Sequence, residues 1–428
     1  MTVPDDVRRR LATQTSQLWG EPGVIDLGIG QPQDALLPVE EFRRALAAAP
    51  VPAYQLQYGI ERGDGALRVA LADALSPRYG AAIDPELMII SNGNSQAIDW
   101  CCAALTRPGD VVLVEDPTYF LARNIFADHG LRVVGLPMDD DGLLPDALAA
   151  ALTAHRPAFV YTVPTYANPT GITTSAARRA EIVQLIARHG SLLVADEVYH
   201  LLSYGEAPPP SYGAWLDSGV VVCLGTFSKI LAPGLRLGWV QAAEPTLARL
   251  EGYGTLVSGG GLNPFAAPIV TAMLQDGSAL TYLDRLRTVY AARVATLDAA
   301  LHDAFGSGGS GDSTGSGRSG SSTAPDGSGG DGGAGGSAGP VSWRTPDGGY
   351  FFWMRFPADV DTAAVRPLAV ARGAAFQPGA KFSTDGGFRH CLRLSFAYYG
   401  EDDLVRAVHA LADAFAAGYP DLHLEDRR

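Results

Sequence analysis

Short apolar runs of strand length recur through the middle of the chain, and between them apolar residues return every three or four positions. The runs are almost continuously apolar, which is typical of parallel strands covered on both faces. The stretches between them have the period of helices. We therefore expect an α/β unit with a mostly parallel sheet, with strands at residues 87–90, 111–114, 132–135, 159–163, 192–195, 220–224 and 237–241 and connecting helices at 95–105 and 176–189.

A smaller unit is expected near the end of the chain. A helical pattern covers residues 279–305, strand-like apolar runs follow at 349–356 and 391–396, and a closing helix is predicted over 402–417. This order of elements favours an α+β unit packed beside the α/β unit. A chain of 428 residues with 47% hydrophobic content is long enough to bury a large core in two domains.

The expected domain organisation has one unusual segment. We expect residues 1–40 to join the small domain, 41–285 to form the large domain and 286–428 to form the small domain. Within the last of these, residues 306–340 consist almost wholly of Gly, Ser, Asp, Ala and Thr. Such a composition cannot bury enough apolar surface to offset its ordering entropy, so it predicts a disordered surface insertion. A passive linker and a docking segment are both compatible with it.

Charge and cysteine content narrow the class of protein. The formal net charge of -14 comes from scattered acidic residues, which argues against general nucleic-acid binding, so a substrate anion must meet individually placed cations. The four cysteines have no metal-ligand spacing and lie in apolar contexts, as buried reduced thiols do. No apolar run is long enough to span a bilayer, and the first residues lack the apolar core of a signal peptide. We expect a cytoplasmic protein with no metal site and no membrane contact.

The stretch S-N-G-N-S-Q-A-I-D begins directly after the first expected strand. A glycine turn that enters a helix presents free backbone N–H groups and the positive end of the helix dipole, which suits a phosphate. Gly93, Asn94, Ser95 and Gln96 are the candidate cradle. An ordinary helix N-cap is the alternative interpretation.

Three further stretches carry side chains suited to a pyridine ring. Tyr119 in E-D-P-T-Y-F follows a strand, where it can stack on a ring or pack in the core. Asn168 in N-P-T-G can donate to a phenolate oxygen, or it can simply form an Asx-Pro turn. Asp196 ends an apolar strand, so its carboxylate needs a cationic partner such as a protonated pyridine nitrogen. Tyr199 can bond the ring's phenolate oxygen; a capping Asp beside a core Tyr is the alternative.

Lys229 lies in the run G-T-F-S-K-I-L-A-P-G-L-R-L-G-W. A lysine among hydroxyls suits imine formation, with Thr226, Ser228 and Arg236 placed to bind a phosphate. A solvated surface lysine is the alternative, but it leaves the uncommon pattern unexplained. Arg393 in C-L-R-L-S-F lies in an expected strand, so its guanidinium needs a carboxylate, supplied by a substrate or by an internal salt bridge.

Together these stretches resemble the fold type I, class I/II aminotransferase family, in particular the branch of the kynurenine/2-aminoadipate aminotransferases and the aminotransferase-like domains of MocR regulators. The resemblance covers nearly the whole chain except residues 306–340. It implies a large domain with a mostly parallel sheet covered by helices, a smaller α+β domain, and pyridoxal 5'-phosphate (PLP) as cofactor. It implies that Lys229 holds PLP as a Schiff base, and that the other cofactor ligands are Gly93, Asn94, Ser95, Tyr119, Asn168, Asp196, Tyr199, Thr226, Ser228 and Arg236.

The resemblance also implies how substrate and subunits are arranged. Arg393 takes the substrate carboxylate, helped by Asn168 and by Gly30 in L-G-I-G-Q-P. The segment L-Q-Y-G-I-E-R-G-D-G-A-L-R is similar to the family's Y-G-x-x-x-G-x-x-x-L-R, whose tyrosine reaches the partner's phosphate. Tyr58 therefore implies an obligate homodimer with shared active sites. The phosphate loop departs from the family, reading G-N-S-Q where relatives often have G-S-Q-Q, which leaves the contacts of its side chains open.

The expected reaction is transamination between an L-amino acid and a 2-oxo acid, with Lys229 as the group that moves the α-proton. The same carbanion chemistry serves elimination, replacement and carbon–carbon bond formation, for example on S-adenosylmethionine, and these stay alternatives. A non-catalytic MocR-like sensor is a third, disfavoured because only about thirty residues precede L-G-I-G-Q-P. Residues 251–275 contain no Lys or Arg, which disfavours a second carboxylate clamp from that region.

Overall fold

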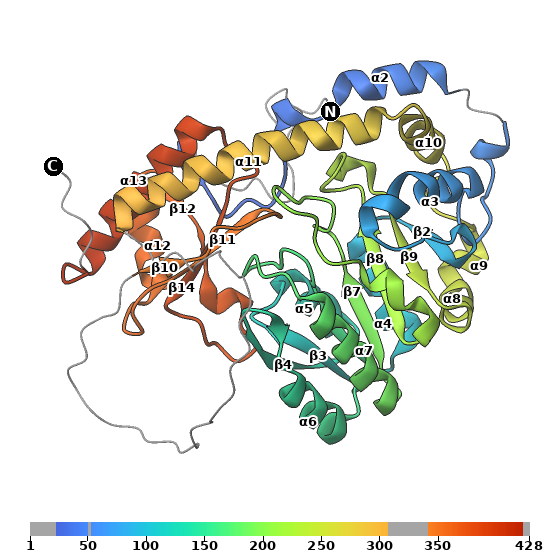
Figure 1. Cartoon of the computed structure of the whole chain (residues 1–428), viewed down its shortest axis with the longest axis horizontal. Helices are drawn as coiled ribbons and strands as arrows, with labels where there is room; N and C mark the ends of the chain where they lie inside the picture. Colours follow the sequence, from blue (N-terminus) through green and yellow to red (C-terminus); the bar gives the residue numbers. More distant parts are fainter. Residues whose placement is uncertain (1–22, 50–52, 307–340, 423–428) are drawn as a thin grey trace, which may run out of the picture.

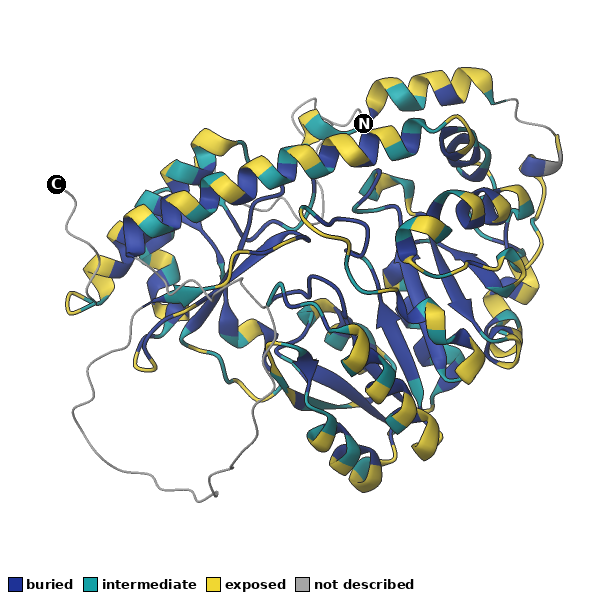
Figure 2. Ribbon diagram, viewed as in Figure 1, coloured by how far each residue is buried: buried dark blue, intermediate teal, exposed yellow. Residues whose placement is uncertain are grey.

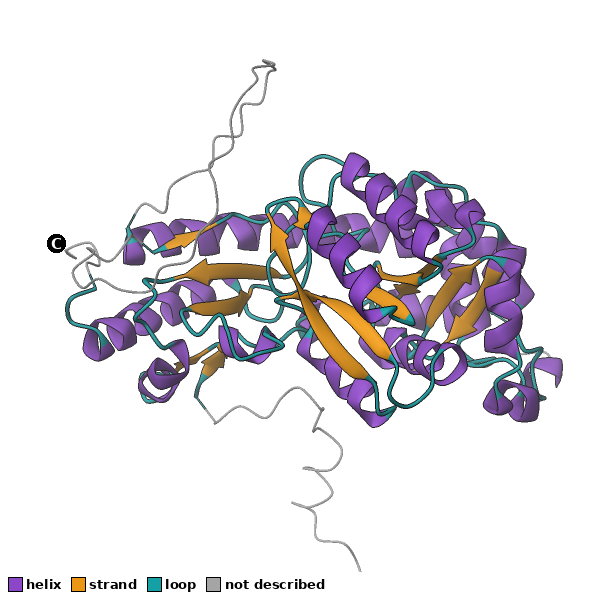
Figure 3. Ribbon diagram, turned by 90° about the horizontal axis from the view of Figure 1, so that it is seen from below, coloured by secondary structure: helices purple, strands orange, loops and turns teal. Residues whose placement is uncertain are grey.

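The computed structural model describes residues 23–49, 53–306 and 341–422 (Figure 1). The predicted insertion at 306–340 lies outside the described residues apart from Gly306, and so does the start of the expected N-terminal segment. The described chain forms one sheet of eight strands, one of four and a pair of short strands. Figure 3 shows these strands among the helices.

The large sheet has eight strands in the order β2-β9-β8-β7-β6-β3-β4-β5. β9 runs antiparallel to both neighbours and β5 antiparallel to β4, while the pairs from β8 to β4 are parallel. This confirms the predicted mostly parallel sheet. The strands are β2 (Met88–Ser91), β3 (Val111–Asp116), β4 (Arg132–Asp139), β5 (Gly142–Leu143), β6 (Phe159–Thr162), β7 (Leu192–Asp196), β8 (Val221–Thr226) and β9 (Gly238–Ala242).

The apolar runs are continuous because both faces of this sheet are covered. Along β8, Val222 and Leu224 belong to one hydrophobic core and Val221 and Cys223 to another, one on each face. Figure 2 shows these strands buried beneath helices whose outer sides are exposed. The helices of this part of the chain are α2 (Val39–Ala48), α3 (Gly65–Tyr79), α4 (Asn94–Leu105), α5 (Phe120–Asp128), α6 (Pro145–His155), α7 (Ala176–His189), α8 (Glu244–Glu251), α9 (Gly254–Gly259) and α10 (Ala267–Gln275).

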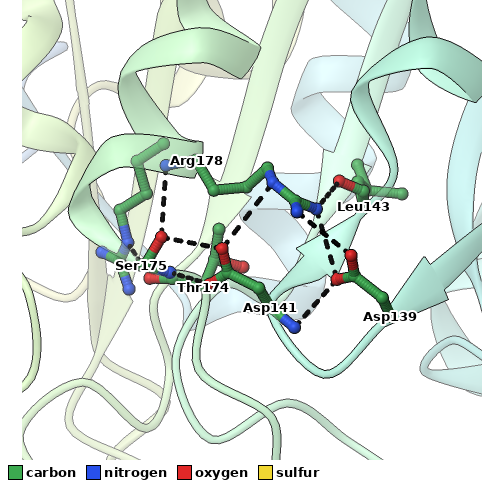
Figure 4. Close-up of polar contacts among 7 residues, drawn as sticks. Asp139, Asp141, Leu143, Thr174, Ser175 and Arg178 are labelled. Carbon is green, nitrogen blue, oxygen red and sulfur yellow. Dashed lines mark hydrogen bonds and ion pairs between the residues drawn. The ribbon is translucent and has the colours of Figure 1, made fainter. Parts of the chain in front are cut away.

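A polar network fixes where α7 begins (Figure 4). Ser175 caps the helix by accepting from the Arg178 backbone, and it donates to Asp141 through its backbone N–H at 2.7 Å and its hydroxyl at 2.8 Å. The Arg178 guanidinium donates to the Leu143 carbonyl at 2.7 Å and pairs with Asp139 at 3.1 Å. The turn between β4 and β5 therefore holds the end of the loop that carries the N-P-T-G motif.

The small sheet has the order β10-β11-β14-β13 and is antiparallel throughout. The short strand β1 (Ile25–Asp26) pairs in parallel with β12 (Ala374–Ala375), which attaches the described start of the chain to this unit. The domain boundaries at 40 and 285 stay predictions. The remaining elements are α11 (Ser278–Phe305), β10 (Ser342–Trp343), β11 (Phe351–Arg355), α12 (Thr362–Val370), β13 (Gln377–Pro378), β14 (Cys391–Ser395) and α13 (Glu401–Gly418).

Candidate active site

A cavity of about 840 Å³ lies where the carboxyl ends of the large sheet's parallel strands face the small unit. Ligands bind at this edge in open α/β sheets, because the loops after the strands leave a crevice there. The cavity gathers residues that are far apart in the sequence. Those of the predicted site that line it are Gly30, Asn94, Ser95, Tyr119, Asn168, Asp196, Tyr199, Thr226, Ser228, Lys229, Arg236 and Arg393.

Asp196 ends β7 and is buried, with 3% of its surface exposed. One carboxylate oxygen accepts from Asn94 Nδ2 at 2.5 Å and the other from Tyr161 OH at 2.8 Å. Burial raises the pKa of Asp196 to about 6, although both hydrogen bonds and the Lys229 charge oppose this shift. An ionised Asp196 at neutral pH is therefore stabilised further by any cation that reaches it.

Asn94 was named as a candidate phosphate ligand with its side-chain contacts left open, and in the structure its side-chain amide donates to Asp196. Its backbone N–H at the start of α4 is left for an anion. Tyr161 of β6, which contacts the same carboxylate, was not predicted at all. The β6 run is continuously apolar, and the sequence does not tell which of its buried residues meets Asp196.

Lys229 lies near this carboxylate in the same cavity. Its Nζ donates to the Gly30 carbonyl at 2.5 Å and stands 5.3 Å from the centre of the Tyr350 ring. Burial, together with the positive charge of Arg393, lowers the pKa of Lys229 to about 8, against the charge of Asp196. An amine with this pKa is neutral to roughly a tenth at pH 7, far more than an ordinary lysine, and the neutral amine is the nucleophilic form.

An anion site lies at one end of the cavity. Gly93 caps α4 with a φ of 85°, and a Cβ there would lie 3.1 Å from the Arg236 guanidinium, so glycine suits both the turn and the close approach. The first turn of α4 has no side-chain cap, which leaves its N–H groups for a ligand. The Thr226 and Ser228 hydroxyls bond each other at 3.0 Å, and Arg236 forms no ion pair among the described residues.

Arg393 lies at the other end and is 4% exposed. Its guanidinium donates to Asn168 Oδ1 at 2.9 Å and to the Gly28 carbonyl at 2.7 Å, and it lies 3.9 Å from the centre of the Phe351 ring. The Nε atom has no hydrogen-bond partner, and within the described ranges no carboxylate pairs with this arginine. Burial lowers the pKa of Arg393 to about 10. The predicted alternative of an internal salt bridge is thus absent, and the guanidinium is left for a carboxylate from outside.

A buried arginine, Arg179, fixes the loop that carries Asn168. The fully buried Arg179 of α7 donates to the Thr174 carbonyl at 2.9 Å, the Pro164 carbonyl at 3.1 Å and the Thr165 hydroxyl at 2.8 Å. Both ends of the loop are therefore tied to one side chain. With Oδ1 of Asn168 bonded to Arg393, its Nδ2 remains for a ligand.

Three of the predicted residues do not line the cavity, and one of these, Gly93, lies against Arg236 at the start of α4. Gln96 accepts a hydrogen bond from the Asn92 backbone at 2.7 Å and does not line the cavity. Tyr58 is 84% exposed and also stays outside the cavity of its own chain. Three cavity residues that sequence reasoning missed are Phe351, Arg366 and Lys381. They belong to the small unit, and no local motif marks them.

The residues of the cavity fit the phosphate and the aldehyde of PLP and the carboxylate of a substrate. The glycine cradle and Arg236 suit a phosphate, the Lys229 amine suits an aldehyde, and the Arg393 guanidinium, which lines the cavity without a carboxylate partner among the described residues, suits a substrate carboxylate. The part of the chain that the structure describes holds no cluster of His, Cys, Asp and Glu suited to a metal. Nor does any helix there have the length and hydropathy needed to cross a bilayer.

Known proteins resemble this chain in sequence and in fold. A family model described as aminotransferase class I and II matches residues 22–316. Aromatic-amino-acid aminotransferase 1 of Thermococcus litoralis is 31% identical over 91% of this chain and 87% of its own, and the uncharacterized HTH-type transcriptional regulator YisV of Bacillus subtilis is 28% identical over 91% and 73%. The crystal structure of Pyrococcus horikoshii kynurenine aminotransferase, in complex with PMP, has a TM-score of 0.79 and 27% identity, covering 98% of this chain and 96% of that chain. The chain therefore belongs to the aminotransferase class I and II family and is a PLP-dependent transferase of fold type I.

Proposed function

We propose that this protein moves the amino group of an L-amino acid to a 2-oxo acid, using PLP held in the cavity. The observation that carries the proposal is the convergence of the Lys229 amine, the Asp196 carboxylate and the unpaired Arg393 guanidinium on one cavity. Bound PLP supplies an electron sink for the substrate's α-carbon.

Each end of the cavity has a role in this proposal. The α4 N-terminus with Ser95, Thr226, Ser228 and Arg236 binds the phosphate. Tyr119 stacks on the ring, Asp196 pairs with its nitrogen, and Asn168 and Tyr199 bond its phenolate oxygen. These assignments are supported by the placement of all of these side chains on the cavity wall.

The substrate's α-carboxylate is bound by Arg393, which Asn168 and the Phe351 ring hold in place. With the carboxylate fixed, the substrate's α-carbon faces Lys229. The neutral Nζ of Lys229 takes the α-proton and returns it to the cofactor side. The Gly30 carbonyl accepts from Nζ and keeps the amine at that place.

The proposal is tested by a half-reaction without an acceptor. PLP-loaded protein is mixed with single L-amino acids, and the products are identified by mass spectrometry. We expect one 2-oxo acid per active site and full conversion of the cofactor to its amine form. Loss of a side-chain leaving group with PLP retained would instead favour elimination or replacement.

The lowered pKa of Lys229 predicts how the cofactor-free protein binds PLP. The neutral amine attacks the aldehyde, and its titration lies near 8 instead of 10.5. Because the neutral fraction of such a group grows from roughly a tenth at pH 7 to nine tenths at pH 9, the binding rate should rise about tenfold and then level off. Stopped-flow absorbance measures it; a rate that still rises tenfold per pH unit above pH 9 contradicts the assignment.

We also propose that the protein works as a homodimer. Five large apolar side chains are exposed on two segments whose backbones touch between Gly59 and Gly261. Such a patch is typical of an interface with a partner, and a second copy would bring the exposed Tyr58 to the other subunit's phosphate site. The patch comprises Leu56, Tyr58, Ile60, Val257 and Phe265.

Replacing Val257 with Asp should dissociate this dimer. Val257 is 65% exposed on α9, and burying a carboxylate twice in a symmetric interface should weaken association at least about tenfold. Sedimentation velocity measures the change. The exposed Ala150→Asp on α6, away from the patch, is the control. A dimer of unchanged strength would place the interface elsewhere.

We propose a cytoplasmic location for the protein. All four cysteines are free and buried, as in proteins kept in a reducing compartment.

A further inference from the structure

The cavity extends past Arg393 along the small unit, where two cations have no role in the proposed function. Arg366 lies on α12 and Lys381 in a short 3-10 helix at Gly379–Phe382. Lysine is scarce in this chain: Lys229 and Lys381 are its two lysines, and both line the cavity. The second lysine therefore shares the substrate's space with the first.

Strand pairing brings Lys381 close to the carboxylate-binding arginine. Gln377 stands opposite Arg393 in the antiparallel β13–β14 pair, and directly opposed residues project from the same face. The Gln377 Oε1 atom accepts from Lys381 Nζ at 2.9 Å. Gln377 is thus bonded to one cation and stands opposite the other in the sheet.

A hydrogen bond from Nε holds the Arg366 side chain beside Gln377 and Lys381. Its Nε donates to the Phe376 carbonyl, one residue before Gln377, at 3.2 Å. In the described part of the chain, its terminal nitrogens have neither a hydrogen-bond nor an ion-pair partner. The free end of the guanidinium has the planar geometry that matches a carboxylate.

No carboxylate forms an ion pair with these cations within the described residues. Lys381 and Arg366 form no ion pair, and burial followed by the charges of Arg366 and Arg393 lowers the pKa of Lys381, with Asp26 opposing. Asp26, the carboxylate on this side of the cavity, already accepts from the Gly28 backbone at 2.7 Å. An anion between the two cations would relieve their repulsion.

Two packed aromatic rings lie beside these cations, and one of them, Phe120, lines the cavity. The Lys381 amine lies 5.4 Å from the centre of the Phe120 ring, and the Arg393 guanidinium 5.1 Å from that of Phe382. The two rings meet edge to face at 5.3 Å. Phe120 thus presents an apolar surface to the cavity beside Lys381, with Phe382 buried against it, and this surface suits the methylene chain of an acid with a carboxylate at each end.

We propose that Arg366 and Lys381 bind the side-chain carboxylate of a dicarboxylic amino acid and of the matching 2-oxo acid, while Arg393 binds the α-carboxylate. This inference rests on the proposed function and names its substrate class. The second clamp comes from the small unit and not from residues 251–275, where the sequence disfavoured one.

The test compares two five-carbon acids that bind without reacting. PLP-loaded protein is titrated by calorimetry with glutarate, which has two carboxylates, and with pentanoate, which has one. We expect glutarate to bind at least about tenfold more tightly, because a charged hydrogen bond to a carboxylate contributes about that factor. Equal affinities would overturn the proposal.

Two variants test whether Arg366 and Lys381 cause the preference for glutarate over pentanoate. Arg366→Gln and Lys381→Gln should each reduce the glutarate preference by about tenfold and leave pentanoate binding unchanged. Lys381 is exposed, so its variant is expected to fold even if the half-buried Arg366 variant does not. The control is Arg372→Gln, an exposed arginine just after α12 that does not line the cavity. Retention of the wild-type ratio in the Lys381 and Arg366 variants would overturn the assignment.

The same preparation separates this inference from the proposed function. If the protein transaminates a monocarboxylic amino acid but shows no glutarate preference, the clamp is wrong and the function stands. If it prefers glutarate yet transfers no amino group from any amino acid, the function is wrong and the anion site stands.

Discussion

Replacing Lys229 with alanine is expected to abolish the visible absorbance of the lysine-bound cofactor and to lower turnover by about 10²- to 10⁴-fold. The substitution removes both the amine that binds the aldehyde and the group that moves the α-proton. It should not unfold the protein, because a buried lysine whose pKa is lowered to about 8 lies in an environment unfavourable to its charge. Absorbance, turnover and thermal unfolding measure the three effects.

The chain's other lysine supplies the control. Lys381→Gln should keep the absorbance band, because Lys381 lies beyond Arg393 beside Gln377. Borohydride reduction followed by peptide mapping gives a second measurement, since these two residues are the only lysines that can carry the label. Label on Lys381, or a surviving band in the Lys229 variant, would contradict the assignment.

Asp196→Asn is expected to lower turnover by at least about 100-fold while PLP stays bound. Asparagine preserves the shape of the side chain but not its negative charge. Without that charge, nothing buried at this point favours a cationic pyridine nitrogen, and the electron sink weakens. Steady-state turnover with an amino acid that the wild type accepts measures the loss, and the absorbance band checks that the cofactor is present.

A milder variant separates the charge of Asp196 from its hydrogen bonds. Tyr161→Phe removes the 2.8 Å bond to the carboxylate and leaves the charge, so we expect less than about a tenfold loss. If Asp196→Asn were no worse than Tyr161→Phe, the carboxylate would not be the partner of the ring nitrogen.

The large sheet and most of the cavity wall could be predicted because they depend on local patterns. Buried parallel strands appear as continuous apolar runs, and ligand-facing residues such as Asn168 and Asp196 follow those runs directly in the sequence. The Arg393 strand was predicted for the same reason. The hydrogen bond between Arg393 and Asn168 was not predicted, because the two residues lie 225 positions apart in the sequence.

The parts that could not be predicted depend on how the two units pack. Arg366 lies in an ordinary helix and Lys381 in a short 3-10 helix, and only the fold places both on the cavity wall. Asn94 was expected near the phosphate by its place in the loop, with its side-chain contacts left open. Its preference for Asp196 depends on a contact across 102 positions, which no local pattern reports.

The central claim is that the protein transfers an amino group, and the most direct measurement follows that group. PLP-loaded protein is incubated with a ¹⁵N-labelled L-amino acid and an unlabelled 2-oxo acid, and both amino acids are analysed by mass spectrometry. We predict ¹⁵N in the new amino acid, in an amount equal to the 2-oxo acid formed from the donor. Release of the label as ammonia, or its retention in a product altered at the side chain, would contradict transamination.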